Sequence, residues 1–221
     1  MNSKTDKKNP AQPFEGAENR RSSTIVPKVV KSTARGERGY DIFSRLLEDR
    51  IVFIGSAIDD TVANVVVAQM LYLQSENSNQ DINLYLHSPG GMITSGLAIY
   101  DTMQLMQCDV ATYVVGQAFS LSAVLLAGGT KGKRYALPHS RIMLHQPWSG
   151  MRGTAADISI HAEEMKRLRG WINDILAEHT GQPVEQIEEQ VDREFYMSAR
   201  DAKEYGIVDD ILEPAESSES E

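Results

Sequence analysis

The stretch VATYVVGQAFSLSAVLL (residues 110–126) joins two kinds of secondary structure. Its β-branched and aromatic first half predicts a strand over 110–116, and the apolar run that follows predicts a helix whose first turn holds Ser120. A second serine, Ser122, lies two residues further on. Because a buried hydroxyl without a hydrogen-bond partner costs free energy, these serines either cap the helix or one of them takes part in chemistry.

Strand and helix patterns alternate along the rest of the chain, which predicts an α/β fold. The segments with strand character are 51–55, 82–88, 110–116 and 140–147. The segments with helical spacing or helix caps are 41–50, 59–77, 93–107, 155–181, 183–191 and 198–206. The helix predicted over 155–181 is too long for a simple crossover connection, so its apolar stripe is suited to face another subunit.

Composition narrows the class of protein. The 221 residues are 41% hydrophobic, which supports one packed domain with tails, and the net charge of −9 disfavours a nucleic-acid partner. Cys108 is the only cysteine, so no intrachain disulfide can form, and we interpret it as a core residue.

No apolar run reaches transmembrane length, so we expect no membrane partner and a cytoplasmic location. We expect a flexible leader over 1–25, a folded domain over 26–212 and an acidic disordered tail over 213–221.

Ser120 has the position of an activated nucleophile. The first turn of a helix offers unpaired N–H groups and a positive dipole end, and both stabilise a developing oxyanion. The N–H of Leu121 is one natural donor. Two glycines in HSPGGM (87–92) allow close approach to the backbone, which makes the N–H of Gly91 a second donor. The competing interpretations are a helix N-cap for the serine and a tight turn for the glycines.

A histidine and an acid complete a candidate catalytic triad. His145 ends the apolar part of MLHQP (143–147), and a histidine fixed at a strand end is well placed as a general base. The segment VDREFYMSA (191–199) offers Asp192 and Glu194, which share one face of an extended chain because they alternate. A structural histidine and solvated carboxylates are the competing interpretations.

Other chemistries have weaker support. Ser122 is a rival nucleophile, His87 is a second candidate base, and Lys131 or Lys133 is a candidate partner in a Ser–Lys dyad. The sequence has no cysteine pair and no HExxH motif, so we expect no metal site. It also has no GxxxxGK[ST] phosphate loop.

Seven stretches in order resemble the family of Clp protease proteolytic subunits (ClpP). They are RGERGYDIFSRLLEDRIVFIG, SPGGMITSGLAIYDTM, GQAFSLSAVLL, KGKRYALPHSRIMLHQP, DISIHAEEM, HTGQPVEQIE and MSARDAKEYGIVD, and together they span about residues 26–212. The resemblance implies a crotonase-like α/β fold with a protruding helical handle. It also implies a serine endopeptidase that forms the proteolytic core of an ATP-dependent protease.

The resemblance also assigns roles within the site. Ser120 matches the nucleophile, His145 the base, and Gly91 and Leu121 the amides of the oxyanion hole. Glu194 stands where the family usually has an aspartate. A glutamate is one methylene longer and still orients an imidazole in Ser–His–Glu triads.

Assembly and partners follow from the same resemblance. It implies a homo-oligomer of two stacked heptameric rings, joined by a handle that matches residues 148–154 and the long helix after them. Arg193 matches an inter-ring contact, and the residues before 26 resemble a propeptide. An AAA+ unfoldase of the ClpX or ClpA/ClpC type is implied, docked on hydrophobic clefts where Tyr85 matches a lining position. That unfoldase uses the ATP and supplies unfolded protein, so no cofactor is expected on this chain.

Two departures from the family pattern leave alternatives open. Glu194 replaces the usual aspartate, with Asp192 as the alternative acid, and Ser122 replaces a glycine and adds bulk near the oxyanion hole. The changed acid is compatible with a catalytically weak or inactive ring subunit that scaffolds active homologues. A crotonase-type acyl-CoA hydratase or isomerase would share the fold and the two-amide oxyanion hole but needs no nucleophile–base pair.

Overall fold

The structure is a computed structural model that describes residues 26–33, 36–147, 150 and 152–213. The predicted leader (1–25) and nearly all of the predicted acidic tail (213–221) lie outside the described residues. The chain divides into two compact units, residues 1–41 and 42–221.

The first unit contains a β-hairpin. Strands β1 (Lys28–Thr33) and β2 (Gly36–Asp41) pair antiparallel, from Lys28 opposite Asp41 to Thr33 opposite Gly36. The sequence analysis predicted no strand here, because β2 is rich in glycine and charged residues, which are depleted in strands. Backbone hydrogen bonds between the two strands stabilise the hairpin, rather than side chains that favour strands.

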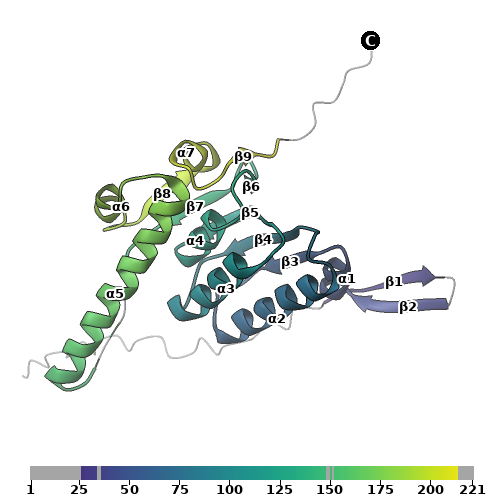
Figure 1. Ribbon diagram of the computed structural model, residues 1–221, viewed down its shortest axis with the longest axis horizontal. Coiled ribbons are helices and arrows are strands. Elements are labelled where there is room, and N and C mark those ends of the chain that lie inside the picture. The colour runs from purple at the N-terminus through teal and green to yellow at the C-terminus, as the bar shows by residue number, and fades with distance from the viewer. Residues whose placement is uncertain (1–25, 34–35, 148–149, 151, 214–221) are drawn as a thin grey trace, which may run out of the picture. The chain divides into compact units, whose positions relative to one another are not determined.

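The second unit is built on a seven-stranded sheet (Figure 1). Its strands are β3 (Ile51–Ile54), β4 (Ile82–Ser88), β5 (Val110–Phe119), β6 (Arg134–Ala136), β7 (Arg141–Leu144), β8 (Phe195–Ser198) and β9 (Asp210–Ile211). The order β3-β4-β5-β6-β9 is parallel throughout, β7 pairs parallel with β5, and β8 pairs antiparallel with β7. The predicted α/β fold class is confirmed.

Seven helices are described in this unit. They are α1 (Ile42–Glu48), α2 (Asp60–Glu76), α3 (Ile93–Leu105), α4 (Leu121–Ala127), α5 (Ala155–Thr180), α6 (Val184–Gln190) and α7 (Ala199–Tyr205). Polar side chains cap several of them: Asp59 begins α2, and Ser198 begins α7 with a capping box. Gly181, in the left-handed conformation, ends α5.

The core lies between the sheet and helices α2, α3 and α4, which cover one of its faces (Figure 1). Along β4 the buried residues alternate with residues of the opposite face, where Tyr85 is half-buried and His87 is exposed. Every residue of α4 is buried. Helix α5 is different: its C-terminal half contributes Leu168, Ile172 and Leu176 to the core, while its N-terminal half, from Ala155 to Glu163, is exposed.

Strand β5 changes partner along its length, and this change sets the position of the site. Residues 112–114 pair with β6, whereas residues 117–119 pair with β7. Gly116 lies between the two segments with φ +79°, a conformation that glycine adopts without strain. As a result, the residues that follow β5 and β7, Ser120 and His145, emerge at the same edge of the sheet.

A buried ion pair ties the end of the fold to the sheet. The guanidinium of Arg134 donates to both carboxylate oxygens of Asp209 (2.6 and 2.9 Å) and to the carbonyls of Ala127 and His179. Arg134 is only 4% exposed. Burial raises the pKa of Asp209, but the hydrogen bonds and charge of Arg134 outweigh burial and hold that pKa below its ordinary value.

Replacing Asp209 with alanine leaves this guanidinium buried without an anion. The free energy of unfolding should fall by about 3–5 kcal/mol at pH 7, measured by urea denaturation. The stabilising contribution exists above the unfolded-state pKa of about 4 and disappears as the pH falls below it, so the deficit of the variant should shrink at pH 3.

The matched control is Asp210→Ala, because Asp210 forms an exposed ion pair with Lys203. Its effect should be far smaller, since exposed ion pairs contribute little. Equal losses in the two variants would contradict this account of the buried pair.

Candidate active site

Ser120 lies between β5 and α4 in a backbone conformation that is rare for a non-glycine residue (φ 53°, ψ −123°). Such conformations cost about 1–3 kcal/mol and persist only where surrounding contacts hold them. Here the N–H of Ser120 donates to the carbonyl of Met143 (2.7 Å), and its own carbonyl accepts from the N–H of Ala123 (2.9 Å). The hydroxyl makes no capping hydrogen bond. The capping interpretation is therefore wrong.

The glycine turn after β4 packs directly against this serine. Gly90 has φ +88°, and a Cβ at this position would lie 2.6 Å from the carbonyl oxygen of Phe119 and 2.9 Å from the Cβ of Ser120. At Gly91 a Cβ would lie 2.1 Å from the carbonyl oxygen of Ile58. Only glycine fits either position. Because Gly90 has no side chain, the backbone of the turn packs directly against Phe119 and Ser120.

Two backbone N–H groups, those of Gly91 and Leu121, accompany Ser120 without a hydrogen-bond acceptor in the described structure. Gly91 forms an isolated bridge with Ile58, in which Ile58 donates to Gly90 and Met92 donates to Ile58. Within the described residues the N–H of Gly91 has no acceptor in this bridge. The N–H of Leu121 is the first of α4 and has no acceptor inside the helix. Two unpaired donors beside a serine hydroxyl can stabilise an oxyanion.

His145 follows the end of β7 and is half-buried. It shares two hollows with Ser120. One is a groove of about 710 Å³ that is also lined by Gly91 and by Met165 of α5. The other is a narrow pocket, whose further lining residues are Ile93, Leu121, Val124, Leu144, Pro147, Ile172, Asn173, Leu176 and Val191. The predicted nucleophile and base therefore border the same space.

The two candidate acids lie on the other side of His145. A cleft of about 650 Å³ is lined by His145, Asp192, Glu194 and, from α5, His161. The carboxylate of Asp192 accepts from the side-chain amide of Gln146 (3.0 Å). Neither carboxylate hydrogen-bonds with the ring of His145 in the part of the chain that the structure describes.

Strand pairing distinguishes the two acids. The β7–β8 ladder runs from Arg141 opposite Ser198 to Leu144 opposite Phe195. The ladder ends there, and the register has changed by Gln146, whose N–H donates to the carbonyl of Val191. One further step in the register of the ladder would place His145 opposite Glu194. Side chains of directly opposed residues lie about 4.5–5.5 Å apart at Cβ, within reach of a carboxylate–imidazole hydrogen bond. Register therefore favours Glu194 over Asp192.

The remaining histidines are engaged elsewhere or exposed. The Nδ1 of His87 bonds with the carbonyl of Val115 (2.7 Å), so the second candidate base is used within the sheet. The Nε2 of His179 bonds with the hydroxyl of Tyr100 (2.8 Å), and burial lowers the pKa of His179. His139 is exposed.

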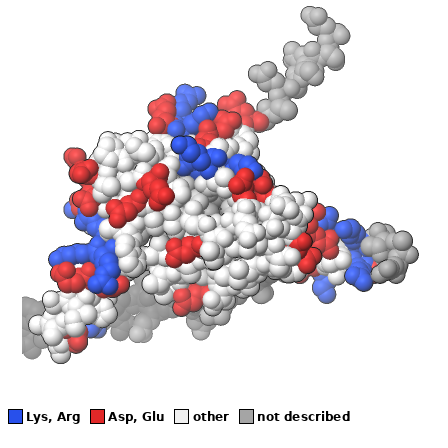
Figure 2. Space-filling view, in the orientation of Figure 1, with Lys and Arg blue, Asp and Glu red and all other residues white. Residues whose placement is uncertain are grey.

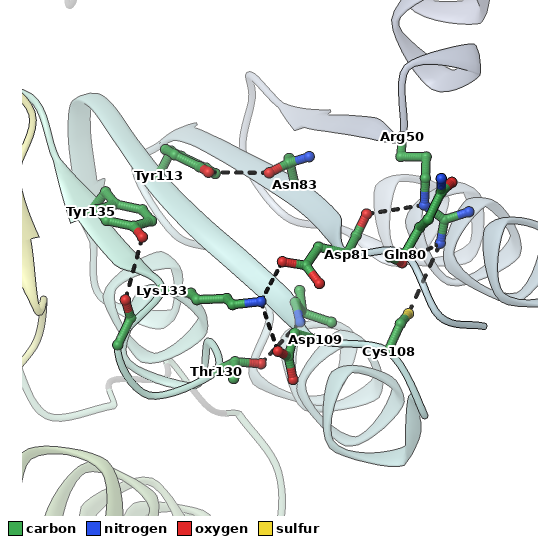
Figure 3. A network of polar contacts seen from close by, with 12 residues as sticks. Arg50, Gln80, Asp81, Asn83, Cys108, Asp109, Tyr113, Thr130, Lys133 and Tyr135 are labelled. Carbon is green, nitrogen blue, oxygen red and sulfur yellow. Dashed lines mark hydrogen bonds and ion pairs between the residues drawn. The ribbon is translucent and has the colours of Figure 1, made fainter. Parts of the chain in front are cut away.

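The Lys133 alternative is wrong because Lys133 is held beside Asp81 and Asp109 (Figure 3), at the other end of the sheet from Ser120. Its ammonium contacts Asp81 and Asp109, the residues just before β4 and β5, whereas Ser120 follows the end of β5. Hydrogen bonds that the ammonium donates to these carboxylates raise the pKa of Lys133. A lysine that remains protonated cannot serve as a general base. The dyad with Lys131, which is exposed, stays a prediction.

No group of three or more His, Cys, Asp or Glu side chains among the described residues could hold a metal ion. None of the described helices has the length and apolar character needed to cross a membrane.

A family model for Clp proteases matches residues 34–215, most of the chain. The chain belongs to the Clp protease family. Clp proteases are peptide-bond hydrolases that work as oligomeric protease cores, so membership supports a ClpP-type peptidase. The segments carrying Ser120, His145 and Glu194 all lie within the matched range.

Sequence reasoning missed two residues beside this Clp protease site. Gln146 holds the loop of Asp192 through its side chain, and its N–H donates to the carbonyl of Val191 (2.6 Å). Tyr196 donates its hydroxyl to Oε2 of Glu194 (3.1 Å). The alternation that placed the two acids on one face extends to Tyr196, so the pattern contained that signal.

Ser122, the rival nucleophile, does not line any of the three hollows around His145. It is fully buried in α4, and its hydroxyl has no hydrogen-bond partner. We therefore expect Ser122→Ala to raise the free energy of unfolding by about 1–2 kcal/mol, because the orphaned hydroxyl is removed and alanine favours helix.

Thermal unfolding of the assembled protein would test this, with Ser95→Ala as the control. Ser95 is also buried in a helix, but its hydroxyl donates to Asp60 (2.5 Å), so its removal should destabilise the fold. A loss of stability in Ser122→Ala would show that its hydroxyl is satisfied.

Proposed function

We propose that this chain is the serine endopeptidase of an ATP-dependent protease, with Ser120 as nucleophile, His145 as base and Glu194 as acid. One observation carries the proposal most strongly. The strained Ser120 leaves its hydroxyl uncapped beside a groove that His145 also lines. A residue held at such a conformation without a structural use for its side chain is typical of a catalytic nucleophile.

In the proposed reaction Oγ of Ser120 attacks the carbonyl carbon of a peptide bond while His145 accepts the hydroxyl proton. The N–H groups of Gly91 and Leu121 stabilise the oxyanion of the tetrahedral intermediate. His145 then protonates the leaving amine as the C–N bond breaks. Water, deprotonated by His145, hydrolyses the acyl-enzyme and regenerates Ser120. Glu194 orients the imidazole and stabilises its protonated form.

The narrow pocket beside Ser120 supports a preference for apolar substrate side chains. Its walls are mostly aliphatic, and the one amide among them, Asn173, is buried with its Nδ2 3.5 Å from the carboxylate of Glu188. Burying an apolar side chain there is favourable, whereas a charged one would lose its hydration. The longer groove past Gly91 and Met165 suits an extended, unfolded polypeptide.

Exposed apolar surface supports a proposed assembly into two stacked heptameric rings. Ile160 and Trp171 of α5 are 68% and 50% exposed. Helix α2 carries no charge between its first and last residues, and its surface is mostly uncharged in Figure 2. Helices that are apolar on several faces are typically covered in the native assembly. In the proposal α5 is the handle between rings.

A row of aromatic side chains supports docking of an AAA+ unfoldase. Tyr85, Tyr113 and Tyr135 lie opposite one another on β4, β5 and β6, and their rings stack at 4.5 and 5.1 Å. All three are half-buried on the sheet face away from α2 and α3. In the proposal this aromatic row contacts an unfoldase of the ClpX or ClpA/ClpC type in the cytoplasm. The unfoldase hydrolyses ATP, and this chain binds no cofactor.

The first test is cleavage of a short fluorogenic peptide by assembled rings, checked by size-exclusion chromatography. Ser120→Ala should lower kcat by at least about 1000-fold, because the nucleophile is lost. Glu194→Ala should lower it by at least about 100-fold, and Asp192→Ala, which removes the residue that binds Gln146, should have a much smaller effect.

A serine-reactive phosphonate separates the alternatives. Labelling of Ser120 in wild type together with peptide cleavage supports the proposal. Assembled rings that neither cleave nor label would instead support the inactive scaffold subunit. Full activity in Ser120→Ala would exclude this serine as nucleophile.

Docking is tested by Tyr85→Ala, which removes the edge of the aromatic row. The ratio of unfoldase-fed protein degradation to short-peptide hydrolysis should fall at least about tenfold, since buried aromatic anchors dominate interfaces. The control is His87→Ala, on the same face of β4 but outside the row. An unchanged ratio in Tyr85→Ala would place the docking surface elsewhere.

A further inference from the structure

Glutamate at the acid position raises a physical problem. Glu194 is exposed and lies just before β8, where the ladder with β7 ends. Its three side-chain torsions are unrestrained unless something binds the carboxylate, and fixing them costs conformational entropy. A triad acid has to hold one orientation toward the base. A hydrogen-bond donor that holds the carboxylate of Glu194 in one orientation would remove this entropy cost from the catalytic step.

The hydroxyl of Tyr196 is the one described group that donates a side-chain hydrogen bond to Glu194. It reaches Oε2 at 3.1 Å, which leaves Oε1 available to another donor. Glu194 and Tyr196 are two residues apart in an extended segment, so their side chains leave the backbone on the same face. The hydrogen bond and the charge of Glu194 raise the pKa of Tyr196, which favours the protonated phenol that donates this bond.

Tyr196 is itself fixed by the elements that hold the nucleophile. It pairs across the ladder with Met143, whose carbonyl accepts the N–H of Ser120. Its ring meets the ring of Phe119, the residue before Ser120, edge-to-face at 5.8 Å and 90°. The guanidinium of Arg141 lies 5.9 Å from the ring centre. The phenol oxygen is thus tied to the backbone around Ser120.

We propose that Tyr196 is a positioning residue of the triad: its hydroxyl holds Oε2 of Glu194 so that Oε1 accepts the N–H of His145. This inference rests on the proposed function. It explains how the side chain of Glu194, one methylene longer than an aspartate, is held in one orientation. Tyr196 lines none of the three hollows around His145, so it acts through Glu194 and not on the substrate.

The other described polar groups around the cleft of His145, Asp192 and Glu194 do not hold the carboxylate of Glu194. Asp192 is held by Gln146, and the guanidinium of Arg193 lies 3.7 Å from Asp192 rather than on Glu194. His161 borders the cleft from α5 without a hydrogen bond to Glu194 in the described structure. Tyr196 is therefore the group whose removal would release the carboxylate.

Tyr196→Phe keeps the ring contacts and removes only the hydroxyl. In assembled rings, kcat for a short fluorogenic peptide should fall about tenfold with KM unchanged, as expected for losing a hydrogen bond to a charged group. In a Glu194→Asp background, where the shorter carboxylate no longer reaches the phenol, Tyr196→Phe should change kcat less than about twofold. Equal losses in both backgrounds, or no loss in the first, would overturn the proposal.

The control is Tyr205→Phe, which removes a hydroxyl that donates to Gln190 and should leave kcat unchanged. Crystal structures of wild type and Tyr196→Phe supply a readout that does not depend on activity. Glu194 should occupy one rotamer in wild type and lose it in the variant. An identical, ordered Glu194 in both would overturn the positioning role, whereas inert rings with an anchored glutamate would count against the proposed function alone.

Discussion

The change of partner along β5 is the constraint on which the rest of the site depends. A strand paired with β6 alone would leave Ser120 six residues beyond the end of β6, because Val114 already pairs with Ala136, the last residue of β6. Instead, residues 117–119 pair with β7, so the turn after β5 meets the end of β7 at His145. The N–H of Ser120 bonds to Met143 because of this pairing, and that bond helps to hold the strained serine. One change of strand partner therefore fixes the positions of Ser120 and His145, the proposed nucleophile and base, together with the backbone conformation of Ser120.

The second sheet contact, between β7 and β8, leads to the proposed acid, Glu194, at the end of its ladder. Antiparallel pairing aligns residues that are far apart in sequence, and a slip of one residue would turn Glu194 to the other face. Buried residues make such a slip costly, since Ile142 and Met197 oppose each other in the core. Hydrophobic packing within this short ladder thereby sets the register that leads to Glu194 at its end.

The two ends of the sheet are chemically different. At the amino ends of β4 and β5, Lys133 contacts two aspartates, and the guanidinium of Arg50 bonds to the carbonyls of Leu73, Gln80 and Asp81 (Figure 3). These contacts satisfy polar groups and stabilise the connections. At the carboxyl ends, the hydroxyl of Ser120 and two backbone N–H groups have no hydrogen-bond partner among the residues that the structure describes. Open α/β sheets bind ligands outside the carboxyl ends of their strands, where polar groups are not consumed by folding.

The sequence by itself determined the α/β class, most helix and strand boundaries within a few residues, and the candidate residues of the site, because hydrophobic periodicity, caps and motif spacing are local. It did not determine the β1–β2 hairpin, whose composition is unfavourable for strands, nor whether Ser120 caps a helix. It left Glu194 and Asp192 unresolved, since both alternate on one face. The tertiary structure decided the first two points, and the register of β7 and β8 supports the proposal of Glu194 for the third. Strand register, the φ of Ser120 and the bond from Tyr196 to Glu194 arise from contacts between segments distant in the chain, and local pattern carries no information about which residues long-range pairing will oppose.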